Sequence, residues 1–283
     1  MPELIDLHTH SRVSDGTETP TEVIQAAIKS GLGTIALTDH DTTDGWAEAF
    51  EAAEGTGVQV IPGMEFSTRW EGKSIHLLAY LIDPENLDLR AETLRIREER
   101  LRRAETIVDK LANDFEISWR DVLDHAGEGA TIGRPHIADV LIAKGIVEDR
   151  GQAFHEILRP GGHYYVPHYA PDPLRAIQLV VAAGGVPVLA HPATRGVGQV
   201  ISKQNLAHLV DAGLFGLELK HRENQADAVA VLEDYAKYFG LVSTGSSDYH
   251  GAGKPNRLGE NSTDSKVLER IIAAATGSSP FQG

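Results

Sequence analysis

The chain has 283 residues, a formal net charge of −15, 41% hydrophobic and 24% charged residues, and no cysteine. This composition is typical of a globular protein, and the negative charge argues against a broad basic face that holds long nucleic acid. The lack of cysteine excludes disulfides, thiolate metal sites and cysteine nucleophiles, so any metal site must use histidine and carboxylate. The start MPELIDLHTH lacks a signal-peptide pattern and no apolar stretch could span a membrane, so we expect a cytoplasmic protein without membrane contacts.

Short apolar runs rich in β-branched residues recur along the chain and predict strands. A helix is predicted over residues 19–31, because Thr19 can cap it, Pro20 suits its first turn and Gly31 suits its end. Helix-like stretches accompany the strands, and this alternation favours an α/β fold with a parallel sheet or barrel. The predicted strands are 4–8, 34–38, 58–63, 74–81, 186–190, 215–219 and 241–246.

The alternation is interrupted between residues 89 and 173. This region begins with a long polar helix in which glutamate and arginine recur four residues apart, as in Glu99 and Arg103, and such spacing is typical of a solvent-exposed, ion-paired face. Further helices are expected before a segment rich in proline, glycine and aromatic residues, at 133–145 and 150–158. We therefore predict a helical insertion or cap domain of residues 89–173 and a discontinuous barrel domain of residues 1–88 and 174–283.

Side chains that can bind metal lie in the predicted strands or just after their ends. In a parallel barrel the carboxyl ends of the strands meet at one rim, where sites are built. His8 and His10 are two residues apart, so a strand directs both to one face and Thr9 to the other. A carboxylate such as Glu65 has enough lone pairs to bridge two cations. Histidine and carboxylate are ligands expected for Zn²⁺, Mn²⁺ or Fe²⁺. The side chains concerned are His8, His10, His40, Glu65, His76, His191, Asp248 and His250, while Asp39, next to His40, is expected to orient a ligand rather than to bind the metal.

Six segments resemble the motifs of the PHP (polymerase and histidinol phosphatase) family. They are DLHTHSRVSDG, ALTDHDT, PGMEFS, IHLLAYL, VLAHP and GSSDYHG, and they occur in the order that the family has. Within the family, SDGTETPTEVI and GRPHIADVLI resemble the stand-alone branch of nucleotide phosphatases. That branch includes 3′,5′-nucleoside bisphosphate phosphatases, also described as 5′→3′ exonucleases on short RNA. The implied fold is a distorted (β/α)7 PHP barrel with an inserted helical cap.

The resemblance implies two or three divalent metal ions per chain, with Mn²⁺ expected and Zn²⁺ or Fe²⁺ as alternatives. Asp15 stands where some PHP proteins have histidine. The implied ligands are His8, His10, Glu65 and Asp248 for the first metal, Glu65, His76 and His191 for the second, and Asp15, His40 and His250 for the third.

The implied reaction is phosphate ester hydrolysis, in which two cations lower the pKa of a water and offset charge on the phosphoryl oxygens. The catalytic candidates are Glu65, Asp248, His191 and His250, and either of the last two could assist the leaving group. The expected substrate is the 3′-phosphate of a nucleoside 3′,5′-bisphosphate (pAp to AMP), with short oligoribonucleotides, attacked from the 5′ end, as a second candidate. The second phosphate needs other cations, and the candidates are Arg134 and His136, by resemblance, together with Arg195 and Lys144.

Alternative functions stay open at this point. The same metals could serve a phosphatase of histidinol phosphate or another small phosphomonoester, or an amide hydrolase, although Arg134 and His136 favour nucleotides. A non-enzymatic metal-binding regulatory module is a third interpretation, against which the complete ligand set argues. The aromatic run around Tyr164 and Tyr169 could stack on a base or pack the cap against the barrel. His125, His155, His208 and His221 match no motif and are expected to be surface or structural residues, and protein partners are not predicted.

Overall fold

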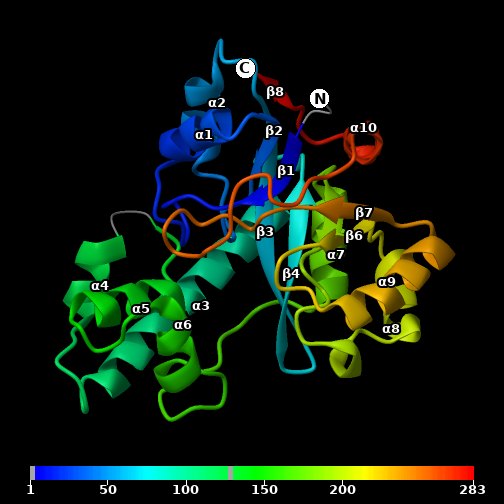
Figure 1. Ribbon diagram of the computed structural model, residues 1–283. Coiled ribbons are helices and arrows are strands. Elements are labelled where there is room, and N and C mark those ends of the chain that lie inside the picture. The colour runs from blue at the N-terminus through cyan, green and yellow to red at the C-terminus, as the bar shows by residue number, and fades with distance from the viewer. Residues whose placement is uncertain (1–3, 127–129) are drawn as a thin grey trace.

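The structure, a computed structural model, describes residues 4–126 and 130–283 and contains a single sheet (Figure 1). Seven strands follow each other in the sheet in sequence order, and a short eighth strand pairs with the third. The strands are β1 (Leu4–Thr9), β2 (Leu32–Leu37), β3 (Gln59–Trp70), β4 (Lys73–Tyr80), β5 (Val186–Leu189), β6 (Gly216–Lys220), β7 (Val242–Gly245) and β8 (Phe281–Gln282). The predicted α/β class is therefore confirmed.

One strand runs against the direction expected of it. β1, β2 and β3 are parallel, as are β5, β6 and β7, but β4 is antiparallel to both of its neighbours. β3 continues well beyond residue 63 and returns through Glu71 and Gly72, whose φ angles of 48° and 80° match the two-residue turn that joins twisted hairpins. The expected parallel barrel therefore contains one antiparallel strand, because a two-residue turn joins β3 directly to β4 and Pro62–Gly63, which suggested the end of a strand, lies inside β3.

The two edges of the sheet meet next to β1. The backbone N–H of His10 donates to the Tyr249 carbonyl at 2.8 Å, and the Tyr249 N–H donates to the His8 carbonyl at 3.4 Å. Thr9 and Tyr249 form an isolated parallel bridge. Tyr249 follows β7, so these contacts join the last strand of the path to the first and give the distorted barrel that the sequence implied.

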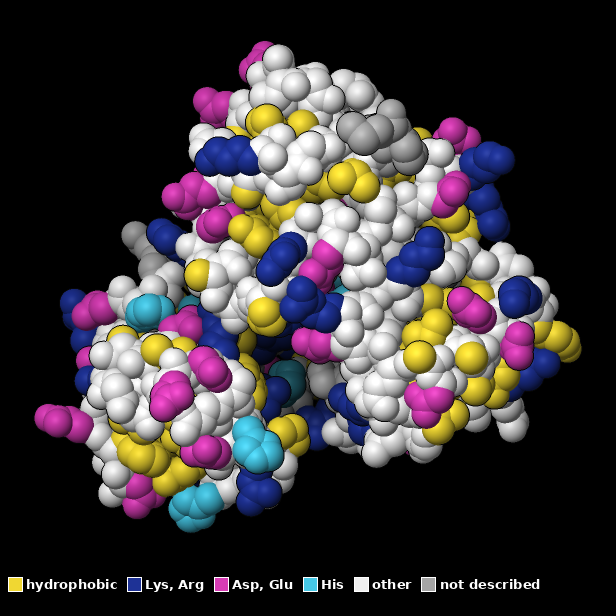
Figure 2. Space-filling model, viewed as in Figure 1, with side chains coloured by type: hydrophobic (Ala, Val, Ile, Leu, Met, Phe, Trp, Pro, Cys, Tyr) yellow, Lys and Arg dark blue, Asp and Glu magenta, His cyan; other side chains and the backbone are white. Residues whose placement is uncertain are grey.

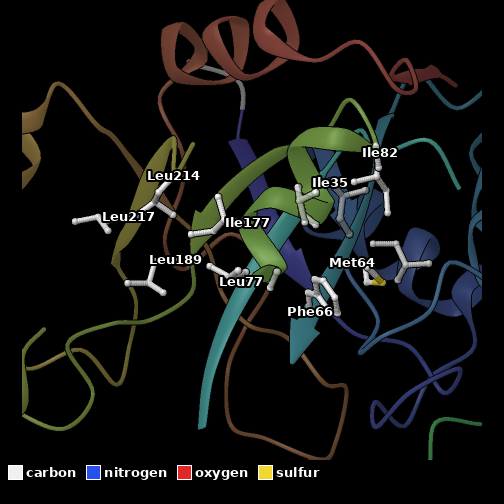
Figure 3. Packing of buried hydrophobic residues seen from close by; sticks show 14 of the residues in the cluster. Ile35, Met64, Phe66, Leu77, Ile82, Ile177, Leu189, Leu214 and Leu217 are labelled. Atoms are coloured by element: carbon white, nitrogen blue, oxygen red, sulfur yellow. The ribbon is translucent and has the colours of Figure 1, made fainter. Parts of the chain in front are cut away.

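Helices pack against the barrel strands through a continuous apolar core. In Figure 3, Ile177 lies among Leu77, Leu189 and Leu214, all members of that core. Burial of such side chains stabilises the fold by about 1.5–3 kcal/mol each. The helices that flank the sheet are α1 (Pro20–Lys29), α2 (Trp46–Ala53), α7 (Pro173–Ala182), a 3₁₀ turn η2 (Val197–Gln199), α8 (Lys203–Asp211), α9 (Ala226–Phe239) and α10 (Ser265–Ala274).

The remaining helices form a separate lobe beside the barrel (Figure 1, lower left), which we call the cap. They are α3 (Leu87–Leu111), α4 (Trp119–Ala126), α5 (Arg134–Ala143), α6 (Arg150–Gln152) and a π-helical turn η1 (Ala153–Ile157). Leu89 and Ile96 of α3 belong to the barrel core, whereas Ile107 and Leu111 belong to the core of the cap. This one long helix therefore anchors the cap. Among the described residues, no helix is long and apolar enough to cross a membrane.

Candidate metal centre and substrate cavity

Two histidines of β1 lie at the centre of the candidate site. His8 and His10 share one face of the strand, while Thr9 turns away and donates its hydroxyl hydrogen to the Ala36 carbonyl. The Nε2 atoms of the two histidines are 3.0 Å apart, and both side chains are fully buried. Asp39 holds the loop that follows β1, because its carboxylate accepts hydrogen bonds from the hydroxyls of Ser11 and Ser14.

Glu65 of β3 presents its two carboxylate oxygens to different histidines. Oε1 lies 2.8 Å from Nδ1 of His76 and 3.2 Å from Nε2 of His191. Oε2 lies within 3.3 Å of three further imidazole nitrogens, the Nε2 atoms of His8, His10 and His40. His76 reaches this rim from early in β4 because that strand runs antiparallel. A carboxylate divided in this way has the geometry of a bridge between two cations.

Two aspartates complete the cluster. Asp248, just after β7, places Oδ1 3.4 Å from Nε2 of both His8 and His10. Asp15 lies 3.3 Å from Nε2 of His250 and 3.8 Å from that of His40. The structure thus brings all nine predicted ligands to one rim. Within the described chain, four sets of three donors are close enough to hold an ion: His8–Glu65–His191, His8–His10–Asp248, His10–His40–Glu65 and His10–Asp15–His250.

The hydrogen bonds around the cluster fit divalent cations at its centre. Nδ1 of His8 lies 3.0 Å from a Glu218 oxygen, which can only accept, so Nδ1 carries a proton and Nε2 is the nitrogen that faces the cluster. His250 likewise donates from Nδ1 to the Asp248 carbonyl at 2.9 Å, so its Nε2 faces Asp15. Imidazole nitrogens and carboxylate oxygens that converge in this way need protons or cations between them, and this donor set suits divalent cations.

The cluster is electrostatically suited to positive charge. Burial would raise the pKa of Glu65, but His40, His76 and His8 around it hold that pKa well below its usual range. Burial acts in the same way on Asp248, where Lys254, at 2.6 Å, is the main group that lowers the pKa of the carboxyl well below normal. Burial lowers the pKa of His40 and keeps it neutral. Burial lowers the pKa of His8, His10 and His191, but the carboxylates around them raise it overall, in His10 to about 9. A bound cation would therefore take the place of protons on these rings.

A cavity of about 770 Å³ opens beside the cluster (Figure 2 shows the hollow between the two lower lobes, with basic and histidine side chains inside it). On one side it is lined by Asp15, His40, His76 and His191. The cap forms another wall, from which Arg100, Arg103, Arg134, Arg150 and His168 line the cavity. Lys254 and the tip of the β3–β4 hairpin complete the lining.

Sequence reasoning missed the arginines of α3, because the helix was interpreted as solvent-exposed. Arg103 does not pair with Glu99; its side chain is buried and Nε donates to the Val166 carbonyl. Burial lowers the pKa of Arg103 to about 9, helped by the charges of Arg134 and Arg100. Arg100 contacts Asp41 at 3.2 Å, whereas Arg103 and Arg134 form no ion pair within the described residues. Arg100 and Arg103 are three residues apart, so they lie on one face of α3. This spacing was the feature of the sequence from which a shared position could have been predicted.

The four predicted substrate contacts fall into two pairs. Arg134 and Arg195 line the cavity, and Arg195 also donates to the Ser74 carbonyl. His136 and Lys144 do not line it. The buried His136 accepts the Gly133 N–H at the start of α5, a capping role, and Lys144 forms a 3.1 Å ion pair with Asp121 inside the cap. A sequence motif does not show to which side of a helix its residues turn, and contact of these two residues with substrate stays a prediction.

The aromatic segment serves mainly as packing. Tyr164 packs on the cap core and donates to Asp114, while Tyr169 packs on the barrel core and donates to Glu92. His168 is the exception, since it lines the cavity. His221, expected to be a surface or structural residue, is buried with Nε2 3.5 Å from Asp248.

These features define an α/β-barrel metallohydrolase, and comparison with known proteins specifies it further. Residues 6–117 match the PHP domain family. A 3′,5′-nucleoside bisphosphate phosphatase of Chromobacterium violaceum is 35% identical over 260 residues, covering 89% of each chain. A 5′-3′ exoribonuclease of Haemophilus influenzae is 33% identical over 88% of this chain and 91% of its own. A crystal structure from Bifidobacterium adolescentis, assigned as a metal-dependent phosphoesterase, superposes with a TM-score of 0.94 at 41% identity over 97% of both chains. The chain belongs to the PHP family.

Proposed function

We propose that this protein is a metal-dependent phosphatase of small phosphorylated nucleotides, with the 3′-phosphate of nucleoside 3′,5′-bisphosphates as its main substrate. The observation that carries the proposal is the position of one cavity between a cluster of metal-ligand side chains and a group of arginines. The activities of the phosphatase and the exoribonuclease similar to this chain support the same substrate class. Short oligoribonucleotides with a 5′-phosphate are the second candidate substrate.

We assign the metals to the donors as the sequence implied. His8, His10, Glu65 and Asp248 would hold the first ion, Glu65, His76 and His191 the second, and Asp15, His40 and His250 the third. Mn²⁺ is the expected metal, because nitrogen and carboxylate donors suit it, and Zn²⁺ and Fe²⁺ are the alternatives. When bound, such ions lower the pKa of a water molecule and polarise the phosphoryl group.

The chain's own residues would then orient the reacting phosphate. Glu65 fixes the spacing of the cluster because each of its oxygens has separate imidazole partners. The His250 ring has its proton on Nδ1, held by the Asp248 carbonyl, so we assign it to metal binding rather than to proton donation. His191 is assigned to the second metal through the nitrogen that lies 3.2 Å from Glu65, so a metal rather than a histidine would offset the charge on the leaving oxygen.

The second phosphate would bind to the arginines of the cap. Arg103 and Arg134 repel each other and lack a carboxylate partner within the described chain, so a bound anion offsets their charges. Guanidinium groups bind phosphate through paired hydrogen bonds. Arg195 supports the phosphate from the opposite loop.

The function can be tested by phosphate release with Mn²⁺ from nucleoside bisphosphates, nucleoside monophosphates, histidinol phosphate and sugar phosphates. We expect the 3′,5′-bisphosphate to have the highest kcat/KM. Preference for histidinol phosphate would contradict the proposed substrate class. An absence of turnover from a protein whose metal content is established would contradict the enzymatic proposal itself.

The arginine site has a matched test on α3. We expect Arg103→Met to lower kcat/KM for a bisphosphate by about 10–100-fold, since a charge-assisted hydrogen bond is worth about 1.5–3 kcal/mol. Activity on a small monophosphate should change little. Arg102→Met is the control, because Arg102 is exposed and forms ion pairs with Glu98 and Glu99 of its own helix. Equal losses in both variants, or an equal loss on both substrates, would contradict a specific phosphate contact.

A further inference from the structure

Resting on the proposed metal centre, we propose that Glu218 is a positioning residue that orients His8 and His191 for metal binding. Glu218 lies in the middle of β6 and is fully buried. The other barrel strands carry a predicted ligand or have one shortly after their ends, whereas β6 carries none. Instead, Glu218 of β6 contacts His8 from β1 and His191 from the end of β5.

Both oxygens of Glu218 are used by these two ligands. Oε1 lies 3.0 Å from Nδ1 of His8, and Oε2 accepts the backbone N–H of His191 at 2.8 Å. The first contact fixes the His8 ring with Nε2 toward His10, Glu65 and Asp248. Because Nδ1 and Nε2 are on opposite sides of the ring, Glu218 lies behind His8 and does not itself face the ion cluster.

The contact with His191 holds an unfavourable backbone conformation. His191 has a φ of +30°, in the left-handed region that side chains other than glycine's disfavour. Its N–H needs a buried acceptor, and Glu218 provides one. The hydrogen bond therefore sets the direction in which the His191 side chain leaves the end of β5 and reaches Glu65.

The two hydrogen bonds from the His8 ring and the His191 backbone satisfy both oxygens of the buried Glu218 side chain. A buried carboxylate on the outer nitrogen of a ligating histidine fixes its tautomer and increases its basicity, and loss of such a partner typically weakens metal binding about 10–100-fold. A role in packing alone would be met equally well by glutamine, which has the same shape.

The test measures metal binding by Glu218→Gln rather than turnover. Apoprotein is prepared by chelation and titrated with Mn²⁺ against a chromogenic chelator, with metal content determined after dialysis. We expect about 10–100-fold weaker binding. The melting temperature of the apoprotein should also fall, because the glutamine amide can accept only one of the two hydrogen bonds, so affinity is measured at a temperature at which both proteins are folded. Thr244→Val is the control, because Thr244 pairs with Glu218 in the β6–β7 register, is buried, and has a hydroxyl without a hydrogen-bond partner among residues 4–126 and 130–283.

Unchanged Mn²⁺ affinity and content in Glu218→Gln would overturn the positioning role, as would an equal weakening in Thr244→Val. If Glu218→Gln does not fold, Glu218→Asp gives the same measurement: it keeps the charge but shortens the reach, and parental affinity in that variant would also overturn the proposal. A parent protein that binds no divalent metal would instead contradict the proposed function, so the two failures are distinguishable.

Discussion

At the scale of single residues, His168 shows how strongly the cap arginines act on their surroundings. Its Nδ1 is buried without a hydrogen-bond partner in the described chain, and the ring lines the cavity. Burial lowers the pKa of His168 to about 3, reinforced by the charges of Arg103, Arg100, Arg69 and Arg134. A histidine kept neutral in this way makes the folded protein sensitive to acid.

The pH dependence follows from the sign of that shift. Between pH 6.5 and about 3 the unfolded chain binds a proton at His168 that the folded chain does not, so the free energy of unfolding falls as pH falls. Because His168→Asn removes this proton-binding group, we expect its free energy of unfolding to fall less steeply as pH falls. The two slopes should differ by less than about 1.4 kcal/mol per pH unit, because the His168 ring is partly exposed. Denaturant unfolding of apoprotein from pH 6.5 downward measures the two slopes. Identical slopes would show that the arginines do not suppress protonation.

Residues with a metal-binding side chain in or beside a predicted strand could be found from the sequence, because strand ends in a barrel converge. The residues that hydrogen-bond to these ligands and orient them could not be found in this way. Glu218 is one acidic residue within an apolar strand and resembles no motif, and its partner His8 lies 210 positions away in the sequence. The direction of a helical side chain was equally hidden, so that Arg103 was expected in solvent and His136 in the cavity.

At the scale of elements, the β3–β4 hairpin is what brings His76 and the cavity wall to the site. The sequence predicted both strands but made the first of them too short, since Pro62–Gly63 suggested an early end and the turn at Glu71–Gly72 lacks the usual Asn-Gly pair. Register Glu65↔Leu78 and Ser67↔His76 then places the histidine beside the carboxylate. The turn therefore determines a part of the metal centre.

The turn residues have positive φ angles, so their identity should affect stability. Gly72→Ala is expected to destabilise the protein by about 1 kcal/mol, because alanine disfavours a φ of 80° although nothing lies near the added methyl group. Glu71→Asn should stabilise the protein by a few tenths of a kcal/mol. Asparagine tolerates a positive φ better than glutamate, so about half of the backbone strain at position 71 is relieved. Chemical denaturation measures both. Gly198→Ala, in open space without a positive φ, is the control, and a similar loss there would contradict the turn argument.

At the scale of the whole molecule, α3 joins two apolar cores and sets the cap over the rim of the barrel. Its ends are anchored in different cores, and Arg150 of α6 adds a second link by donating to the Asp15 carbonyl while pairing with Asp139. The sequence predicted an inserted helical region here. It could not show that the insertion's first helix also belongs to the barrel core, because its polar composition concealed the narrow apolar face.

The overall charge and the enclosed cavity together limit the length of a nucleic acid substrate. A chain longer than a few nucleotides must leave the cavity across a protein of net charge −15, and repulsion between like charges opposes this. We expect kcat/KM to be at least about tenfold lower for a 5′-phosphorylated RNA of about 24 nucleotides than for one of about three nucleotides. This difference in kcat/KM should become smaller when the salt concentration is raised from about 50 to about 300 mM, because the Debye length shortens.

Initial rates on single-stranded RNA of graded length, at both salt concentrations, measure this dependence. The bisphosphate pAp, assayed in parallel, corrects for any effect of salt on the reaction itself, because it fits within the cavity and meets little of the outer surface. Equal kcat/KM for short and long RNA would contradict the limit that the cap imposes. A length dependence that does not respond to salt would assign the limit to the shape of the cavity rather than to charge, since only the electrostatic part is screened by ions.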